Sequence, residues 1–490
     1  MASTQATTDG RQGCTATGWQ HLYVRHKPEE TPLYPIIEQH AHRFFAELRE
    51  QGTSLPSFVQ AEFEHYLRCG RLEGGFIRVK CADCRHEHLV AFSCKCRGWC
   101  PSCSARRMVE TAAYLVDHVF PQVPIRQWVL SFPWPLRLLF AARPDLLTRV
   151  LGVVTRALST AVIKRAGLSH RAGAQSGIVS FIQRFGSALN LNIHLHLLVL
   201  DGAYTFTDDT ARFHHAPAPS QAELERLLDT LVRRITRTLV RAGVLVEDPE
   251  QPWLDLDVGS PLEQLAAAAV RYRITVGPLA GRKTMTLHSA SAVARDGVTV
   301  KALTAARDGF SLNAAVACEA HQREKLERVC RYVARGPIAL ERLSVDGDGL
   351  VVYQLKHPFR DGTTHVLFEP LDFIARLASL VPRPRTHLVR YHGLFAPNAK
   401  HRDHIVARPA PTAQPGDDIL EAKPSTAMSW MQRLRRVFAI DISTCPRCGG
   451  NVRVIAAITE PAIITRILEH RAAVVEPGGG ARAPPGASRH

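Results

Sequence analysis

The sequence predicts an α+β protein with an antiparallel sheet in its core, a small cysteine-rich module near the N-terminus and a short cysteine knuckle near the C-terminus. Three observations lead to this fold class. Two β-rich runs, 177–185 and 189–200, flank the short link 186–188, which indicates an antiparallel hairpin. Stretches with helical apolar spacing lie before and after this hairpin. Cysteines cluster within 69–103 and recur at 445–448.

The order of elements follows from apolar periodicity and from helix-ending residues. Ser220 can cap the helix that follows it, and Gly336–Pro337 would end another. The aromatic, proline-containing stretch 128–135 is interpreted as a separator between two helices. Helices are predicted at 31–50, 56–69, 104–120, 143–167, 221–242 and 320–335. Further strand-like pieces are predicted at 271–276, 284–287 and 349–355.

Length and composition limit the class of protein. A chain of 490 residues is long enough for about three domains. Apolar residues make up 46% and charged residues 22%, which excludes a mostly disordered or collagenous protein. Lys and Arg number 61 against 45 Asp and Glu, giving a net charge of +16. This surplus predicts a polyanionic partner.

Composition shifts predict seven segments. They are a flexible leader (1–30), a cysteine-rich domain (31–120), an α+β core domain (121–345), its basic extension (346–407), a linker (408–428), a C-terminal CxxC region (429–473) and a disordered tail (474–490). No apolar run reaches the roughly 18–20 residues of a membrane span. Residues 1–13 lack the apolar region of a secretory signal, so a cytoplasmic, reducing location is expected. In a reducing compartment the clustered cysteines favour metal ligation over disulfides.

The strongest motif is a pair of CxxC knuckles. Cys81 and Cys84 are separated by fifteen residues from Cys100 and Cys103, a spacing typical of four thiolates around one tetrahedral zinc. The alternative is four reduced core cysteines. Five more potential ligands lie near this motif in sequence: Cys69, Cys94, Cys96, His86 and His88. They either form a second metal site or are simply buried thiols and solvated imidazoles. Cys445 and Cys448 make half a site, to be completed by His470 or another chain, or else a metal-free turn.

A His-x-His pair interrupts an apolar strand. His194 and His196 project from one face of that strand, where two imidazoles can chelate a divalent cation. Gln183, on the preceding strand, is a candidate third ligand if the register places it on the histidine face. The alternative is a pair of structural histidines.

A tyrosine lies at the border of the buried stripe of the 320–335 helix. Tyr332 has Arg328 four residues before it and Arg335 three residues after it, so guanidinium groups surround its hydroxyl. A tyrosine that attacks a phosphodiester needs such cations and a metal ion. The alternative is a boundary tyrosine whose hydroxyl reaches water.

Several ordered segments together resemble one family, the transposases of insertion sequence 91. They are SFIQRFGSALNLNIHLHLLVLDGAY (180–204), KLERVCRYVARGPIALERL (325–343), DGTTHVLFEPLDFIARL (361–377) and VPRPRTHLVRYHGLFAPNAKHR (381–402). The segment CADCRHEHLVAFSCKCRGWCPSC (81–103) is similar to the zinc-binding domain of that family. The resemblance covers about 30–405, and the C-terminal knuckle extends it to about 470.

The resemblance implies an HUH-type single-strand DNA nuclease that drives rolling-circle transposition. It implies that 31–120 is a zinc-binding and DNA-binding domain and that 121–345 is the nuclease domain. His194 and His196 would hold Mg²⁺ or Mn²⁺ at the HUH positions. Tyr332 would be the nucleophile, leaving a 5′-phosphotyrosine and a free 3′-hydroxyl. The implied partner is single-stranded DNA at transposon ends near the nucleoid, with Zn²⁺ as structural metal and no membrane.

One position departs from the family. Two-tyrosine members carry a tyrosine where this chain has Arg328, so the chain resembles the single-tyrosine branch. A second tyrosine would come from Tyr391, Tyr353 or another subunit of a homo-oligomer. Two other functions are weighed: a zinc-dependent DNA-binding regulator with an inactive nuclease core, and an RNA-binding zinc protein, which no RNA-module motif supports.

Overall fold

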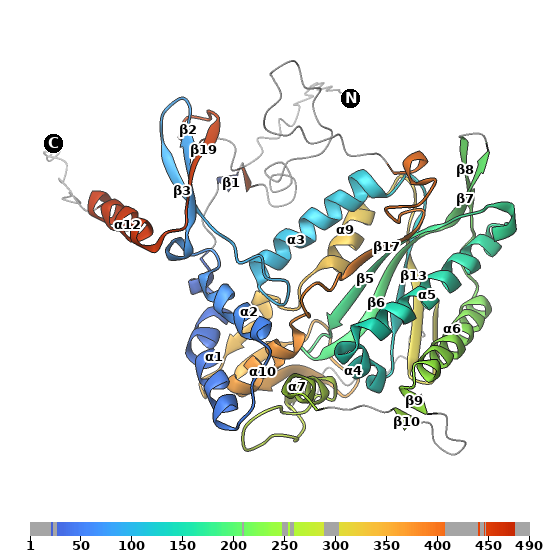
Figure 1. Cartoon of the computed structure of the whole chain (residues 1–490), viewed down its shortest axis with the longest axis horizontal. Helices are drawn as coiled ribbons and strands as arrows, with labels where there is room; N and C mark the ends of the chain where they lie inside the picture. The colour runs from blue at the N-terminus through green and yellow to red at the C-terminus, as the bar shows by residue number, and fades with distance from the viewer. Residues whose placement is uncertain are drawn as a thin grey trace, which may run out of the picture.

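The computed structural model describes residues 21–22, 27–207, 210–246, 253–254, 259–288, 303–406, 440–441, 445 and 447–475 (Figure 1). The predicted linker lies outside these residues, as do most of the predicted leader and tail. The described part is α+β, as predicted. The boundaries of the seven segments remain predictions.

A six-stranded antiparallel sheet, the main sheet, forms the centre of the molecule. Its strand order is β12-β13-β4-β6-β5-β17. The strands are β4 (Ile125–Ser131), β5 (Gly177–Phe185), β6 (Leu191–Leu200), β12 (Thr304–Arg307), β13 (Phe310–Cys318) and β17 (Val389–Gly393). Because β6 lies in the interior of the sheet, the His-x-His motif that it carries has a fixed backbone on both sides.

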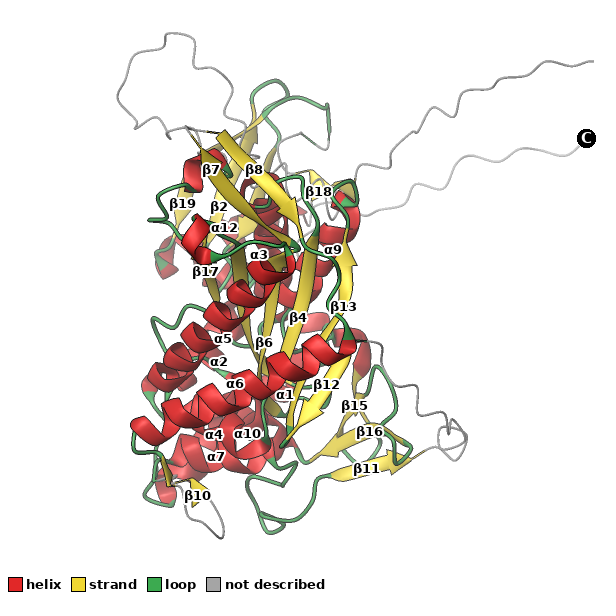
Figure 2. Ribbon diagram, turned by 90° about the vertical axis from the view of Figure 1, so that its right-hand side faces the viewer, coloured by secondary structure: helices red, strands yellow, loops and turns green. Residues whose placement is uncertain are grey.

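Helices cover both faces of the main sheet (Figures 1 and 2). On one face α4 (Trp134–Ala142), α5 (Pro144–Arg165) and α6 (Gln221–Arg241) bury a large aliphatic core, which includes Leu195 and Leu197 of β6. On the other face α3 (Pro101–Tyr114), its π-helical continuation Leu115–Val119 and α9 (Arg323–Ala334) pack on the sheet. The histidines of β6 lie on this second face, because they alternate with the buried leucines.

The β5–β6 hairpin and the long amphipathic helix α6 confirm two predictions. Ser220 and Glu223 form a reciprocal capping box at the start of α6, as the sequence signal indicated. The hairpin pairs Ile178 with Val199 at one end and Gln183 with His194 near the other. This register places Gln183 on the histidine face of the sheet.

One expectation about local structure was incomplete and another was wrong. The stretch 128–135 contains most of β4, a central strand of the main sheet, because Trp128 and Leu130 are fully buried between the helical layers. The predicted strand 271–276 is a turn with a single bridge between Arg273 and Lys283. Chain reversals at Gly277 and Gly281, both with positive φ, keep that ladder short.

The N-terminal module packs beside the main sheet. Its helices α1 (Leu33–Glu50) and α2 (Ser57–Arg68) share a core with α10 (Pro370–Leu380) and with a four-stranded sheet. That sheet consists of β11 (Met285–His288), β16 (Thr363–Phe368), β15 (Val351–Gln354) and β14 (Leu343–Val345). A three-stranded sheet combines β2 (Phe76–Cys81) and β3 (Glu87–Ala91) with β19 (Val452–Ile458), which precedes α12 (Pro461–Val475). The N-terminal module therefore includes chain from near the C-terminus.

The remaining elements are short or peripheral. They are β1 (His21–Leu22), β7 (Gly202–Thr207), β8 (Thr210–His215), β9 (Leu245–Val246), β10 (Trp253–Leu254), α7 (Pro261–Val270), β18 (Ile440–Asp441) and 3₁₀ turns at Pro28–Glu30, Leu72–Gly74, His170–Ala172, Leu340–Arg342 and Arg402–His404.

In the described part of the chain one helix, α5, has the length and hydropathy of a membrane span. One face of α5 is buried against α6 and β5, which is the pattern of a core helix.

A buried ion pair ties the end of β6 to its neighbours. Asp201 accepts hydrogen bonds from Arg126 of β4 in a forked arrangement, with Nη2–Oδ2 at 2.7 Å and Nε–Oδ1 at 3.1 Å. Arg165, at the end of α5, lies 3.7 Å from the same carboxylate. The geometry fixes one end of the hairpin relative to the helical layer.

Replacing Asp201 by alanine is expected to lower the free energy of unfolding by about 3–5 kcal/mol, because it leaves the buried Arg126 guanidinium without its counter-charge. Urea denaturation followed by tryptophan fluorescence measures this loss. The matched control is Asp145→Ala, which removes a half-exposed pair with Arg143 and should change stability by about 0.5 kcal/mol or less. Equal shifts for both variants would contradict the structural role of Asp201.

Candidate functional site

Three polar side chains meet on the face of the main sheet that is covered by α3 and α9. Gln183 of β5 lies directly opposite His194 of β6, and His196 follows on the same face. All three are at least nine-tenths buried. The Gln183 side-chain nitrogen is buried without a hydrogen-bond partner in the described part of the chain. A buried amide nitrogen without an acceptor is typical of a side chain whose partner is a ligand, or of an amide whose oxygen and nitrogen are to be exchanged, which turns the oxygen to the unfilled side.

The two imidazoles present their Nε2 atoms to each other, 3.1 Å apart. His194 donates from Nδ1 to the carbonyl of Asn192 at 2.9 Å, so in the neutral ring its Nε2 has no proton. The Nδ1 of His196 is 2.8 Å from the side-chain nitrogen of Gln127. Exchanging the oxygen and nitrogen of that amide lets the oxygen accept from Nδ1 and leaves the Nε2 of His196 without a proton. Burial, with a smaller contribution from nearby Arg335, lowers the pKa of His194 to about 4 and of His196 to about 3. Both rings are therefore neutral at physiological pH.

This donor set fits a divalent cation. Ligand bonds of about 2.1 Å at right angles separate two donors by roughly 3.0 Å, close to the distance between the two Nε2 atoms. Anchored Nδ1 atoms fix the rings as in known metal sites. Gln183 can supply an amide oxygen, and the three side chains leave further coordination positions open. The residues predicted as metal ligands are thus brought together.

Tyr332 lies next to this group. Its ring and that of His196 have centroids 6.0 Å apart and planes at 89°, although the residues come from α9 and β6. Tyr332 is 43% exposed, so its hydroxyl can be reached by a bound substrate. The amphipathic helix α9 produces this placement: Leu326, Cys330 and Val333 are buried, and Tyr332 lies at the edge of that stripe.

Cations surround the tyrosine ring. The Arg335 guanidinium is 4.5 Å from its centroid, and the Lys356 ammonium is 5.8 Å from it. The buried Nε of Arg335 has no hydrogen-bond partner among the described residues. Arg328 lies one turn earlier on α9, is 64% exposed and is 4.0 Å from Glu324. Arg328 and Arg335 are the two arginines that the helix pattern placed beside Tyr332 as candidate contacts to DNA phosphate. Of these two, Arg335 is the one in contact with the tyrosine.

A cavity of about 1540 Å³ opens beside Tyr332, between the N-terminal module and the main sheet. Its wall includes five cations: Lys95, Arg106, Arg335, Arg342 and Lys356. Aromatic rings also line it: Phe92, Phe185, Tyr332 and Phe359. Tyr332 is exposed, Phe92 and Phe359 are half-buried and Phe185 is buried. Cations and aromatic rings in one wall are a combination found in grooves for nucleic acid.

The two alternative tyrosines lie elsewhere. Tyr353 is fully buried and hydrogen-bonded at 3.4 Å to the Pro337 carbonyl, and burial raises its pKa. Tyr391 is on β17 opposite Val179, four residues along β5 from Gln183, and burial raises its pKa to about 12. Tyr332 is the tyrosine in ring contact with the histidine pair.

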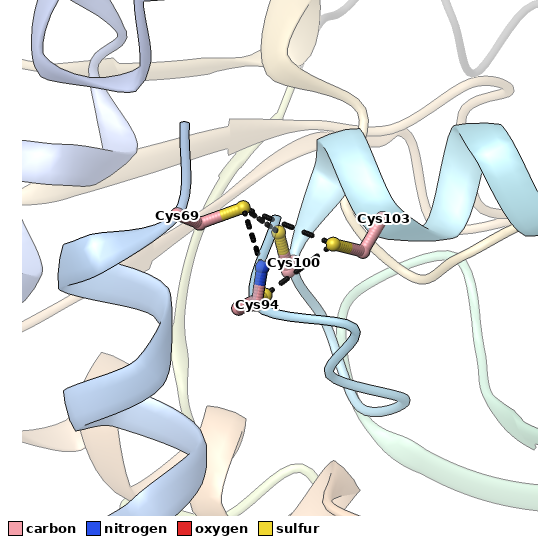
Figure 3. A group of neighbouring side chains, drawn as sticks. All are labelled: Cys69, Cys94, Cys100 and Cys103. Atoms are coloured by element: carbon pink, nitrogen blue, oxygen red, sulfur yellow. Dashed lines mark hydrogen bonds between the residues drawn. The ribbon is translucent and has the colours of Figure 1, made fainter. Parts of the chain in front are cut away.

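Four cysteines form a tight group near the cavity (Figure 3). Cys69 follows α2, Cys94 follows β3, and Cys100 and Cys103 lie at the start of α3. The Cys94–Cys103 sulfurs are 3.4 Å apart and the Cys69–Cys103 sulfurs 3.8 Å apart. Zn–S bonds of about 2.3 Å in a tetrahedron place sulfurs about 3.8 Å apart, whereas a disulfide needs about 2.05 Å. Hydrogen bonds from the neighbouring thiols, that of Cys100 first, lower the pKa of Cys103. The group therefore fits a structural zinc ion.

The predicted grouping of zinc ligands needs correction. Cys100 and Cys103 lie with Cys69 and Cys94, but Cys81 and Cys84 do not join them. Cys81 and Cys84 lie instead with Cys445 and Cys448 of the C-terminal knuckle. The sequence spacing was consistent with one four-cysteine site, but the β2–β3 hairpin carries its knuckle away from the start of α3.

Two further contributors were not identified from the sequence. Gln127 was missed because its stretch was not recognised as a strand, although a lone polar residue within IRQWVLS was a usable signal. Lys356 had no motif around it, and only the fold brings it to α9. The cavity itself depends on packing between distant segments.

Comparison with known families agrees with these observations. A family described as a putative transposase matches residues 177–403. A family described as a transposase zinc-binding domain, that of insertion sequence 91, matches residues 36–132. Neither the curated proteins nor the solved structures that were searched gave a match. The first region contains the histidine pair and Tyr332. The second contains every cysteine of the two groups described above except Cys445 and Cys448, which lie outside both regions. These two matches support a transposase of the insertion sequence 91 family that carries a zinc-binding domain.

Proposed function

We propose that this transposase nicks and rejoins single-stranded DNA at transposon ends, with Tyr332 as nucleophile, and so drives rolling-circle transposition in the bacterial cytoplasm, close to the nucleoid. The observation that carries this proposal is the contact between Tyr332 and His196. This contact places a tyrosine whose hydroxyl is open to substrate next to the pair of histidines. The histidine pair itself has the donor geometry of a metal site.

The catalytic metal would be Mg²⁺ or Mn²⁺ held by His194, His196 and Gln183. When bound, such an ion neutralises charge on the scissile phosphate. The protein supplies the arrangement: the Nδ1 contacts orient both rings, and burial keeps both of them neutral.

In the proposed step, the Tyr332 oxygen attacks the phosphorus and forms an O–P bond. The bond from phosphorus to the 3′-oxygen breaks, the tyrosine proton is lost, and the departing 3′-oxygen gains a proton. The products are a 5′-phosphotyrosine and a free 3′-hydroxyl, so rejoining is the same exchange in reverse. Arg335 and Lys356 lie beside the ring and are suited to stabilise negative charge on the tyrosine and phosphate oxygens.

The cavity supports a single-stranded substrate. Its aromatic residues can stack on unpaired bases, and its cations can follow the phosphate backbone. Arg335 would contact the phosphate next to Tyr332. Arg328, further out on α9, would contact the strand as it leaves the site. The position of Arg328 and the burial of Tyr353 favour a mechanism with one tyrosine per chain.

A nicking assay tests this proposal. The purified protein is incubated with Mg²⁺ or Mn²⁺ and single-stranded oligonucleotides from the ends of its own element, labelled at either end. A 3′-label is expected to migrate with the protein on a denaturing gel, while a 5′-label appears on a shorter strand that a polymerase can extend. The same sequences as duplex serve as control and should give little adduct.

Two outcomes would contradict the proposal. A protein-bound 5′-label would mean the opposite polarity of attack. DNA binding without any nick, in the presence of either metal, would favour the alternative function, a zinc-dependent DNA-binding regulator with an inactive nuclease core.

A further inference from the structure

Two cysteine knuckles from opposite ends of the chain face each other in the three-stranded sheet. Cys81 ends β2 and Cys84 lies in the following turn, while Cys445 and Cys448 precede β19. The Cys81 and Cys448 sulfurs are 3.5 Å apart, as are those of Cys84 and Cys445. All four lie within 4.8 Å of one another. These distances are close to the edges of a zinc–thiolate tetrahedron, about 3.8 Å.

The two knuckles are built alike. In the first, the amide of Cys81 donates to the carbonyl of His86 at 2.9 Å. In the second, the amide of Cys445 donates to the carbonyl of Gly450 at 2.7 Å, again five residues ahead. The Arg447 amide also points to the Cys445 sulfur at 3.4 Å. Tight turns with amides directed at sulfur are suited to hold thiolates.

Strand pairing sets the approach of the two knuckles. β19 pairs antiparallel with β2, from Val452 opposite Cys81 to Ile458 opposite Phe76. The Ala82 amide donates to the carbonyl of Asn451 at 2.9 Å. The four sulfurs therefore converge because the sheet register places them together, although the paired cysteines are more than 360 positions apart.

The C-terminal segment 445–475 has little apolar core of its own. Among its described side chains only Cys445 and Ile464 are buried, while Val454 and Ile455 are exposed. So small a buried apolar surface stabilises such a segment weakly, and small modules of this kind commonly depend on a bound metal. The cysteine group occupies the position where that stabilisation is needed.

We infer that Cys81, Cys84, Cys445 and Cys448 bind a second structural Zn²⁺, which fastens the segment 445–475 to the β2–β3 hairpin. Four thiolates fill the tetrahedral shell and leave no open position, so this ion has a structural and not a catalytic role. Cys445 and Cys448 lie outside both matched family regions, so the zinc-binding module of this chain is completed by its C-terminal end.

The first measurement is zinc content. Full-length wild-type protein, purified under reducing conditions, is expected to contain about two zinc ions per chain by mass spectrometry of the metal. The double variant Cys445→Ser/Cys448→Ser should contain about one, because the Cys69 group is untouched. The matched control is Cys318→Ser, a buried cysteine at the end of β13 outside both groups, which should keep both ions.

The second measurement is limited trypsin digestion. Arg453, Arg466 and Arg471 are cleavage sites within the segment, and they should be cut several-fold faster in the double variant while the core resists as in wild type. Two results would overturn the inference: one zinc per chain in wild type, or an unchanged zinc content in the double variant. Iron in place of zinc would overturn the choice of metal. None of these readouts depends on nicking activity, so they separate this inference from the proposed reaction.

Discussion

Replacing Tyr332 by phenylalanine is expected to abolish the covalent protein–DNA adduct and to lower nicking by about 10⁴-fold or more, as loss of a catalytic nucleophile does in other enzymes. The change removes only the hydroxyl. Phenylalanine keeps the ring contacts with His196 and Arg335, so folding and DNA affinity should stay close to those of wild type. Adduct on a denaturing gel and DNA affinity by fluorescence anisotropy are the two measurements.

Tyr391→Phe is the matched control, since it removes a hydroxyl from the same face of the main sheet but away from the histidine pair. It should leave adduct formation within about twofold of wild type. Trypsin digestion of the trapped adduct locates the bond directly, because Arg331 and Arg335 bracket a four-residue peptide that contains Tyr332. A modified peptide that contains Tyr391 would refute the assignment and the single-tyrosine mechanism.

Replacing either metal-facing histidine should have the next largest effect. His194→Ala and His196→Ala are each expected to lower nicking by about 10³-fold, which corresponds to the several kcal/mol of charge stabilisation that a bound metal supplies. Zinc content should not change, because the cysteine groups lie elsewhere. Binding of Mn²⁺, followed by electron paramagnetic resonance, should be lost together with the nicking.

A graded response distinguishes metal binding from general damage. Gln127 contacts the outer nitrogen of His196, so Gln127→Ala should weaken Mn²⁺ binding by about 10–100-fold, and raising the metal concentration should restore nicking. Nicking at wild-type rates by both histidine variants would mean that the pair is structural. Loss of activity without loss of Mn²⁺ binding would contradict the assigned ligands.

Much of the catalytic face could be predicted because its signals are local. The alternation around His194 and His196 fixed their common face, and a three-residue link between the two runs indicated the hairpin. Helical periodicity placed Tyr332 at the border of a buried stripe. Each of these patterns is contained in one short stretch of chain, where strand and helix geometry alone determine which side chains share a face.

The features that could not be predicted depend on contacts between segments that lie far apart in the sequence or on the layers that cover a strand. β4 lacks clear alternation, because helices cover both faces of the main sheet and bury five of the seven side chains of that strand. The cysteine grouping could not be predicted from spacing, because Cys81 and Cys84 find their partners across the whole length of the chain. The register that aligns Gln183 with His194 likewise required the structure, since a slip of one residue reverses the face.

The contact between α3 and α9 limits how this transposase can be recombined with its relatives. Cys100 and Cys103 start α3, which packs along α9, and a side chain at Gly336 would come within 2.5 Å of Ser104. The region matched to the zinc-binding domain also extends to residue 132 and thus includes β4, a central strand of the main sheet. The zinc-binding half is therefore not an exchangeable cassette. A chimera joined within 104–132 would combine half of one nucleophile-bearing interface with half of another, so a functional graft must carry α3, β4 and α9 from the same parent.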